Sequence, residues 1–110
     1  MQPNELADHY FPAVRTRDIE RFMALFAADA VMILPDGREV AGAPAIRALE
    51  EQVFATGAPL PQPRFITVGE ASVAVEIDVH LPDGRVMKAA NFYQLDAAGL
   101  IKRVSTYRKI

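Results

Sequence analysis

The feature that most constrains how this chain can fold is a strict alternation of side chains in Ala71–Leu81. Every second residue of this segment is a large aliphatic one, namely Val73, Val75, Ile77, Val79 and Leu81. The residues between them are small, polar or charged. Because successive side chains of a β-strand point to opposite faces, this pattern predicts a strand that is buried on one face only. The rest of the chain must supply the elements that cover that face.

A tight turn is predicted directly after this strand. The pentapeptide Leu-Pro-Asp-Gly-Arg occupies 81–85, and the same five residues occur at 34–38. Proline presets the first position of a turn, aspartate suits the second, and glycine accepts the positive φ that follows. We interpret the two copies as one turn solution used twice rather than as an internal repeat. In a three-residue hairpin, Leu81 lies opposite Arg85 and the chain returns as a second strand.

This register assigns faces to the returning strand, Arg85–Asp96. Its odd-numbered residues share the face of the valines, and they include Asn91 and Tyr93. Lys88 falls on the other face, close to Asp78, where a cross-strand ion pair is expected. The pattern therefore predicts a hairpin with an apolar face and a charged face.

Residues 18–51 are predicted to form a helix, a strand, a tight turn, a short return strand and a second helix. Asp18 is of the residue type that is preferred at a helix N-cap. Val31–Leu34 is predicted to be a short strand, Gly42 to end the return strand, and Pro44 to lie in the first turn of the next helix. The apolar stripes of the two helices are Ile19, Phe22, Met23 and Phe26, then Ile46, Leu49, Val53 and Phe54.

A further helix is predicted before this unit, and further strands after it. The helix spans Pro3–Thr16, and Pro12 is expected to kink it or to end it early. One face of this helix carries Leu6, Tyr10, Phe11 and Val14. Thr56–Pro63 is rich in proline and is predicted to be a connector. The strands predicted after it are Arg64–Val68, Ala71–Leu81, Arg85–Asp96 and Leu100–Lys109.

Helices and strands are segregated along the chain, which predicts an α+β fold. A long sheet with one apolar face must curl around the helices to bury that face. We therefore expect a curved antiparallel sheet that is wrapped around about three N-terminal helices. At 110 residues the chain suits a single domain with one core, and we take residues 1–110 as that domain.

Composition excludes several classes of function. The formal net charge is −2 with both signs scattered, so there is no basic face for nucleic acid or an anionic membrane. The absence of cysteine excludes disulfides, thiolate metal sites and cysteine nucleophiles. The two histidines, His9 and His80, are far apart, and neither a metal nor a cofactor is expected. No membrane-spanning run or signal pattern is found, and we expect a cytoplasmic protein.

Several short motifs carry a family resemblance. They are Asp18-Ile19, Leu25-Phe26-Ala27-Ala28-Asp29-Ala30-Val31, Gly42 before Ala45-Ile46-Arg47, and Phe92-Tyr93-Gln94-Leu95 before Gly99-Leu100-Ile101. With these motifs spread over nearly the whole chain, the sequence resembles the nuclear transport factor 2 superfamily. The resemblance implies the cone-shaped α+β fold of ketosteroid isomerases and polyketide cyclases, with a hydrophobic pocket in the cone. It is specific for the fold rather than the chemistry, because this fold hosts enzymes, binding modules and dimerisation domains.

The resemblance to ketosteroid isomerases also implies roles for individual residues. Those enzymes use an aspartate base, with a tyrosine and a protonated aspartic acid as the oxyanion hole. Tyr10 matches the tyrosine and Asn91 matches the aspartic acid, and an asparagine is a neutral donor at every pH. The base falls on Leu34, whose alkyl side chain cannot take a proton. The isomerase mechanism therefore does not transfer to this chain as it stands.

Glu50 is the alternative candidate for proton transfer. It stands four residues after Ile46 and four before Phe54, at the edge of the apolar stripe of its helix. The resemblance also points it towards the pocket, because the bacterial isomerases have a tyrosine near the oxyanion hole at this position. A carboxyl group against an apolar wall has a raised pKa, which suits a general base or acid near neutral pH. The alternative is an ordinary solvated glutamate at the helix edge.

The remaining pocket residues follow from the resemblance and from the predicted faces. We expect the cavity to be lined by Val14, Phe22, Phe26, Leu34, Leu49, Val75, Met87, Tyr93, Val104 and Arg108, with Thr106 at a further matching position. An inward Arg108 would indicate an anionic ligand, and a guanidinium group in solvent is the alternative. Tyr10 and Asn91 also have structural interpretations, as a core tyrosine and as an amide that is hydrogen-bonded within the protein.

Three functions fit these observations. The first is a ketosteroid isomerase-like or polyketide cyclase-like enzyme that transfers a proton next to a carbonyl of a small apolar ligand, without a cofactor. Its catalytic residues would be Tyr10, Asn91 and Glu50. The second is a non-catalytic binding protein that has lost the base at Leu34. The third is a dimerisation module whose pocket is filled by Met87, Tyr93 and Phe54.

A homodimer is expected in each case, because related folds pair through the outer face of the sheet. The residues predicted to give that face its apolar surface are Ala90, Phe92, Ile101 and Tyr107. Neither a nucleic acid nor a membrane is expected as a partner.

Overall fold

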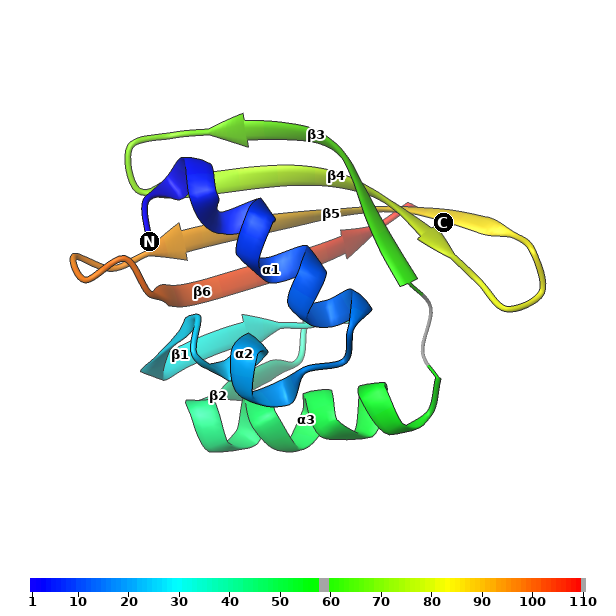
Figure 1. Cartoon of the computed structure of the whole chain (residues 1–110), viewed down its shortest axis with the longest axis horizontal. Helices are drawn as coiled ribbons and strands as arrows, with labels where there is room; N and C mark the ends of the chain where they lie inside the picture. The colour runs from blue at the N-terminus through cyan, green and yellow to red at the C-terminus, as the bar shows by residue number, and fades with distance from the viewer. Residues whose placement is uncertain (58–59, 110) are drawn as a thin grey trace.

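The computed structural model describes residues 1–57 and 60–109, which form one curved sheet and its covering helices (Figure 1). The helical elements are η1 (Pro3–Glu5), α1 (Leu6–Arg15), α2 (Ile19–Met23) and α3 (Ala43–Ala55). The strands are β1 (Phe26–Ile33), β2 (Glu39–Ala41), β3 (Leu60–Val68), β4 (Ser72–His80), β5 (Val86–Leu95) and β6 (Ile101–Arg108). They are ordered β2-β1-β6-β5-β4-β3 in the sheet. The predicted α+β fold is confirmed.

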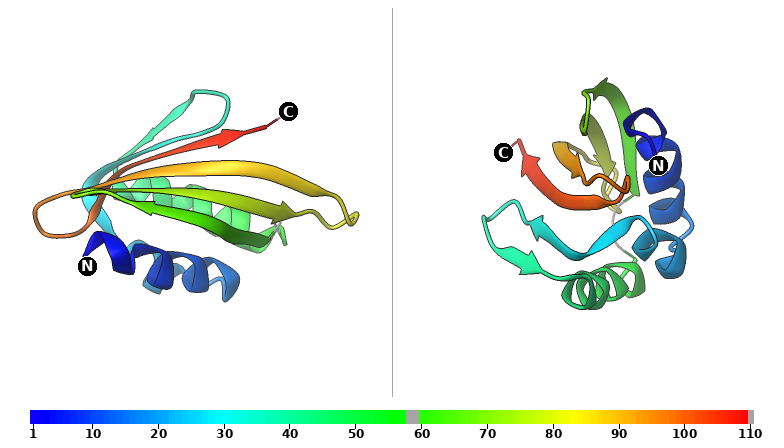
Figure 2. Two further views of the ribbon diagram at one scale, coloured as in Figure 1. Left: turned by 90° about the horizontal axis from the view of Figure 1, so that it is seen from above. Right: turned by 90° about the vertical axis from the view of Figure 1, so that its left-hand side faces the viewer.

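The sheet bends strongly, and the helices lie on its concave side (Figure 2). Helix α1 packs against β3, and α3 packs against β1. Neighbouring strands are antiparallel except β1 and β6, whose parallel pairing was not predicted. The largest side chains buried between the sheet and the helices include Leu6, Phe11, Phe22, Ile46, Tyr93 and Ile101. The core therefore lies inside the curve of the sheet.

Helix α1 runs through Pro12, which does not end it early. The helix continues to Arg15 and is capped by Thr16. Proline cannot donate a hydrogen bond to the carbonyl of Asp8, so the helix loses one backbone bond there. Burial of Leu6 and its apolar neighbours against the sheet stabilises the helix in spite of that loss.

Strand β1 begins at Phe26 rather than at Val31, where the apolar run predicted it. Phe26 pairs with Ile101 of β6, so it belongs to the sheet and not to the apolar stripe of α2. The residues between Phe26 and Val31 are mostly alanine, which has little preference for strands. Pairing with a distant strand therefore decides the conformation here, and a bulge before Val31 absorbs the irregular register.

Strand β3 begins at Leu60, inside the segment Thr56–Pro63 that was predicted to be a connector. Two prolines, Pro61 and Pro63, lie within the strand. Both are tolerated because β3 is an edge strand that pairs with β4 alone, so a missing N–H can face away from the ladder.

The hairpin of β4 and β5 has the predicted register. Val75 lies opposite Asn91, and Leu81 donates its backbone N–H to the carbonyl of Arg85. Gly84 has a φ of 90°, the left-handed conformation that favours glycine. The valine face of the hairpin points into the core, where Val75 is 1% exposed.

The opposite face of the hairpin carries the predicted ion pair. Lys88 of β5 lies 2.5 Å from a carboxylate oxygen of Asp78, and Arg64 of β3 lies 2.7 Å from the other. Hydrogen bonds from Lys88 and then Arg64 hold the pKa of Asp78 below its usual value. Three strands are thus joined across the outer face by one carboxylate.

The outer face also exposes two aromatic side chains. Phe92 is 46% exposed and Tyr107 is 58% exposed, and their rings meet edge to face at 5.6 Å. Ile101 was predicted to share this face, and that prediction is wrong. Its side chain is fully buried, because it pairs with Phe26 on one side and Leu95 on the other, in the core.

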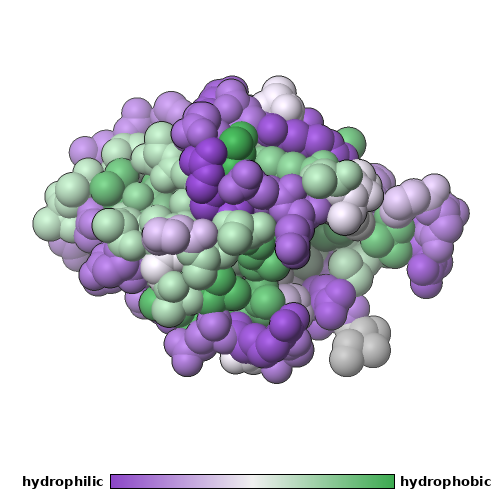
Figure 3. Space-filling view, turned by 90° about the horizontal axis from the view of Figure 1, so that it is seen from below, coloured by the Kyte–Doolittle hydropathy of each residue, from purple (hydrophilic) through white to green (hydrophobic). Residues whose placement is uncertain are grey.

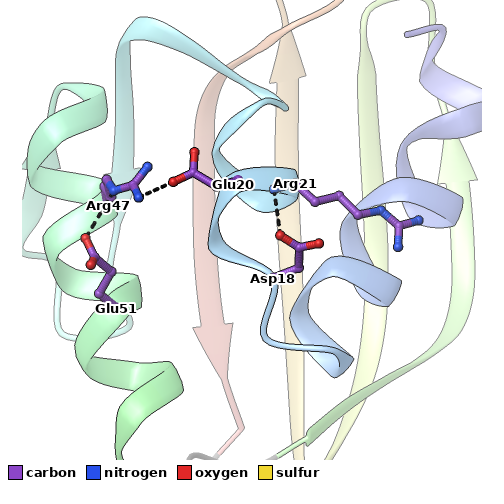
Figure 4. A network of polar contacts seen from close by, with 5 residues as sticks. All are labelled: Asp18, Glu20, Arg21, Arg47 and Glu51. Carbon is purple, nitrogen blue, oxygen red and sulfur yellow. Dashed lines mark hydrogen bonds and ion pairs between the residues drawn. The ribbon is translucent and has the colours of Figure 1, made fainter.

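A polar network joins α2 to α3 (Figure 4). Asp18 accepts a hydrogen bond from the backbone N–H of Arg21 at 3.1 Å, which confirms the predicted N-cap. Arg47 of α3 pairs with Glu20 of α2 and with Glu51 one turn further along its own helix. The network orients α3, the helix that carries the candidate carboxyl group.

The surface on the side of α3 carries both hydrophobic and hydrophilic residues. Hydrophobic residues form a central band between hydrophilic borders in this view (Figure 3).

The longest helix in the described part of the chain is α3, with 13 residues. None of the described helices is long and apolar enough to cross a membrane.

Candidate functional site

Two tyrosines meet on the concave side of the sheet. Tyr10 comes from α1 and Tyr93 from β5, and their ring centroids are 5.0 Å apart in an edge-to-face arrangement. An interaction between their hydroxyl groups contributes to the pKa of each phenol, raising that of Tyr10 and lowering that of Tyr93. Burial raises the pKa of both phenols. Both hydroxyls therefore keep their protons at neutral pH and can act as donors.

Asn91 extends this pair along the same face of β5. Its Nδ2 donates to Oη of Tyr93 at 2.8 Å, and its Oδ1 accepts from Oγ1 of Thr106 at 2.8 Å. Asn91 and Tyr93 are neighbours because they are two residues apart on one strand, and Thr106 lies directly opposite Asn91 on β6. The result is one hydrogen-bonded chain, Thr106–Asn91–Tyr93, with the ring of Tyr10 packed against its last member.

Glu50 faces this chain from α3. Its side chain is partly buried, and burial raises its pKa to about 7. Its charge raises the pKa of both Tyr10 and Tyr93, so the carboxyl group lies within electrostatic range of the two phenols. A carboxyl group with this pKa exchanges a proton readily near neutral pH.

Further aromatic side chains pack next to Tyr10. The ring of Phe22 lies 5.3 Å from Tyr10, 5.0 Å from Phe26 and 5.9 Å from Phe54, measured between centroids. Phe22 is fully buried, and Phe54 comes from the last turns of α3. Phe22 therefore contributes to the apolar surroundings of the Tyr10 ring.

The predicted pocket residues fall into three groups by exposure. The buried ones are Phe22, Phe26, Val75, Tyr93 and Val104. Those partly buried are Val14, Leu34, Leu49 and Met87. Arg108 lies at the end of β6 opposite Ala89, and its side chain is exposed. No guanidinium group is therefore held inside the sheet at that position.

The charges of the buried residues limit what the site can bind. Among the described residues, the buried polar or charged ones are Asp78, Asn91 and Ser105, and none of these is a cation. No group of three histidine, cysteine or acidic residues in residues 1–57 and 60–109 is placed to hold a metal. Glu50 is then the charged group that faces the phenols.

Sequence reasoning missed the connection between Thr106 and Tyr93. Thr106 was placed only by resemblance, and Tyr93 was expected to be a pocket wall. The two-residue spacing of Asn91 and Tyr93 was the available signal, because it puts both on one face of a strand. Predicting the contact of Thr106 with Asn91 required the register of β5 against β6, which the sequence did not provide.

Two hollows in the surface of the described residues lie away from this site. One of about 380 Å³ lies between the N-terminus and the β5–β6 turn, where its lining includes Gln2, Glu70 and Asp96. Another, of about 300 Å³, lies on the outer face beside Asp78 and Phe65. Neither is lined by a residue of the hydrogen-bonded chain.

The sequence matches a known domain over most of its length. The description of that domain is "SnoaL-like domain", and the match covers residues 7–104. The chain belongs to the SnoaL-like family. This places it among the nuclear transport factor 2-like proteins, as the sequence motifs predicted. No curated protein matches its sequence.

Solved structures confirm the fold of this SnoaL-like protein. A candidate ketosteroid isomerase from Kribbella flavida is 24% identical with a TM-score of 0.89, covering 99% of this chain and 78% of the other. An epoxide hydrolase/cyclase-like enzyme with a role in pyran-ring formation in the polyether salinomycin is 19% identical with a TM-score of 0.84, covering 98% and 91%. A protein from Sphaerobacter thermophilus is 28% identical with a TM-score of 0.81, covering 100% and 98%.

Proposed function

We propose that this protein binds a small, neutral, carbonyl-containing ligand between Glu50 and the phenols, and transfers a proton next to that carbonyl. The observation that carries the proposal is the position of Glu50. It is a carboxyl group with a pKa of about 7, and its charge acts on two phenols that stay neutral. A general base works best when its pKa lies near the working pH, and an enolate needs a hydrogen-bond donor at its oxygen.

The reaction balances with these groups alone. The carboxylate of Glu50 takes a proton from the carbon next to the carbonyl. The C–H electron pair forms a carbon–carbon double bond, and the carbonyl π pair moves to the oxygen, which accepts a hydrogen bond from Tyr10. When the ligand is β,γ-unsaturated, this enolate is a dienolate. Return of the proton to its γ carbon re-forms the carbonyl, gives the conjugated isomer and restores the carboxylate.

The negative charge stays constant in this site throughout the reaction. It begins on Glu50, whose charge disfavours a phenolate at Tyr10. Once Glu50 has taken the proton it is neutral, so the charge that develops on the ligand oxygen meets no opposing charge from the base. The hydroxyl of Tyr10 can then stabilise that oxygen.

The ligand is expected to be uncharged and largely apolar. The site has aromatic walls, and the described residues place no buried cation near it. A ligand carboxylate would meet Glu50 and find no compensating charge. The ketosteroid isomerase and cyclase names of two solved neighbours support this class of ligand and reaction.

The test is turnover of a β,γ-unsaturated 3-ketosteroid to its conjugated isomer, followed by ultraviolet absorbance. We expect wild type to be active, and both Tyr10→Phe and Glu50→Gln to lose most of that activity. Glu51→Gln is the matched control, because Glu51 is an exposed neighbour on the same helix that pairs with Arg47. Equal rates in Glu50→Gln and Glu51→Gln would contradict a role for Glu50.

The second candidate function is ligand binding without turnover. The residue that favours it is Leu34, which stands where the resembled isomerases have their base and is partly buried against the core. Under this alternative, wild type binds the steroid without converting it, and Leu34→Asp gains the activity. Activity in wild type that does not need residue 34 would exclude it.

We also propose that the chain forms a homodimer through the outer face of the sheet. Phe92 and Tyr107 support this, since both are large, apolar and about half exposed on neighbouring strands. On the same face, the carboxylate of Asp78 already has Lys88 and Arg64 as cationic partners.

A further inference from the structure

We propose that Arg17 is a positioning residue that holds the last turns of α3, and with them Glu50, in place beside the sheet. This inference rests on the proposed function, in which Glu50 is the base. It concerns a residue of the connection between α1 and α2, which acts on the base through the backbone of α3.

The contact between Arg17 and α3 is a hydrogen bond to the helix backbone. Nη1 of Arg17 donates to the carbonyl oxygen of Phe54 over 3.0 Å, across 37 positions of the chain. The last carbonyls of a helix have no partner within the helix itself. Thr56 donates to the carbonyls of Gln52 and Val53, through its backbone N–H and its hydroxyl. Arg17 supplies the donor for the carbonyl that follows.

The charge of Arg17 also suits this position. The C-terminal end of a helix carries partial negative charge, so a cation placed there is stabilising. The last turn of α3 reads Gln-Val-Phe-Ala and has no basic residue of its own. Arg17 therefore brings a cation and a donor to the end of α3 from a different element.

The backbone of Arg17 indicates that its side chain has a role. Its φ is 54°, and among residues 1–57 and 60–109 it is the one non-glycine residue with a positive φ. Its N–H donates to Val14 and that of Asp18 donates to Ala13, a pair of bonds that closes α1. Glycine is usual at this position, and a larger residue is strained there. The bond to α3 is a function that glycine could not perform.

Glu50 lies between two points at which α3 is tied to the region of α2. Arg47, three residues before Glu50, pairs with Glu20 of α2 (Figure 4). Phe54, four residues after Glu50, accepts the bond from Arg17. The pair of Arg47 and Glu20 is exposed, and exposed ion pairs contribute little. The partly buried bond from Arg17 is therefore the stronger anchor.

The last turns of α3 also face the proposed site. Ile46, Glu50 and Phe54 are spaced by four residues and share one face of the helix. Ile46 is fully buried, and the ring of Phe54 meets that of Phe22, which in turn meets the ring of Tyr10. Without the bond from Arg17, the end of α3 is expected to loosen and to move Glu50 away from Tyr10 towards solvent.

The test uses three substitutions of Arg17. Arg17→Met keeps an unbranched stem without the cation, and Arg17→Lys restores a cation of similar reach. Arg17→Gly removes the side chain but suits the left-handed backbone, so relief of strain offsets the lost hydrogen bond and the variant should stay about as stable as wild type. Arg21→Met is the matched control, because Arg21 is an exposed arginine of α2 whose side chain points away from α3 (Figure 4).

The first readout is turnover of the β,γ-unsaturated 3-ketosteroid. We expect kcat to fall about 10- to 100-fold in Arg17→Met and Arg17→Gly, with KM within about 3-fold of wild type, because the base is displaced and the ligand contacts remain. Arg17→Lys and Arg21→Met should keep kcat within about 3-fold of wild type. A low kcat in Arg17→Gly at unchanged stability towards urea separates positioning from a merely structural role. Wild-type kcat in Arg17→Met would overturn the inference.

A second readout separates this inference from the proposed function. The carboxyl carbon of Glu50 can be titrated by NMR, and in wild type burial raises its pKa to about 7. We expect Arg17→Met and Arg17→Gly to lower this pKa by about one unit, since the carboxyl group becomes more exposed. Loss of a nearby cation would by itself raise the pKa, so a fall reports exposure.

The two readouts fail independently. If wild type does not convert the steroid, the proposed function fails, and the titration of Glu50 still decides the role of Arg17. A pKa of Glu50 that is the same in wild type, Arg17→Met and Arg17→Gly would overturn that role.

Discussion

Asn91 donates its amide hydrogen to the hydroxyl of Tyr93 over 2.8 Å, so the residue that resembles the oxyanion aspartic acid is engaged inside the protein. Its carbonyl end is engaged as well, by Thr106. The amide therefore supports Tyr93, and the proposed donor to a ligand is Tyr10. This differs from an oxyanion hole in which two side chains reach the ligand separately.

Replacing Tyr10 or Tyr93 by phenylalanine should separate donation to the ligand from support of the hydrogen-bonded side chains. Tyr10→Phe removes the proposed donor to the ligand, and we expect kcat to fall by about 10²- to 10³-fold. Tyr93→Phe leaves Tyr10 in place and should lower kcat by only about 10-fold, but it removes the acceptor of Asn91. Its free energy of unfolding should fall by about 1–3 kcal/mol, because a buried amide N–H is left unpaired. Steady-state kinetics and urea denaturation measure the two effects, and the reverse order of rates would contradict the assignment.

The rate of proton transfer should depend on pH through Glu50. The carboxylate is the active form, and its pKa is about 7. We therefore expect kcat/KM to rise tenfold per pH unit well below pH 7 and to level off above it. Both phenols stay protonated over this range, because burial raises the pKa of each. A profile that is flat from pH 5 to pH 8 would exclude Glu50 as the base.

The same pKa predicts a change in stability with pH. The usual pKa of a glutamate is 4.5, so between that value and about 7 the folded protein binds more protons at Glu50 than the unfolded chain does. The contribution of Glu50 to stability is complete below pH 4.5 and is lost as the pH rises through 7. Glu50→Gln does not suffer this loss and should be more stable than wild type by on the order of 2 kcal/mol at pH 8, with little difference at pH 4.5. Urea denaturation at both pH values checks this, with Glu51→Gln as the control that should show no such difference.

Local patterns in the sequence predicted those parts of the fold that depend on neighbouring residues. The alternation in Ala71–Leu81 and the turn that follows gave the register of the β4–β5 hairpin, including Asp78 beside Lys88. Asp18 as a helix N-cap is equally local. By contrast, the early start of β1 at Phe26 depends on pairing with β6, which no local pattern reports.

The last strand shows most clearly why part of the site was not predictable. The register between β5 and β6 shifts between Gln94 and Leu95. Such an irregularity changes which residues of a strand face inwards. It turns Ile101 into the core while Thr106, five positions further on, still faces Asn91. A regular alternation cannot place both Ile101 and Thr106 on the inner face. The hydrogen bond from Thr106 to Asn91 therefore emerges only from the structure.

The outer face of the sheet provides a prediction about assembly. If Phe92 and Tyr107 lie in a dimer interface, a charge introduced at either position would be buried without a partner. We expect wild type to have twice the chain mass of 12.1 kDa in solution, and Phe92→Lys and Tyr107→Lys to be monomeric at micromolar concentration. Val68→Lys is the matched control, because Val68 has a similar exposure of 47% and lies at the end of the edge strand β3. Sedimentation equilibrium measures the masses, and circular dichroism shows whether each variant is folded. A wild-type protein that stays monomeric at high concentration would exclude this interface, whereas dissociation of Val68→Lys alone would place the interface at the sheet edge instead.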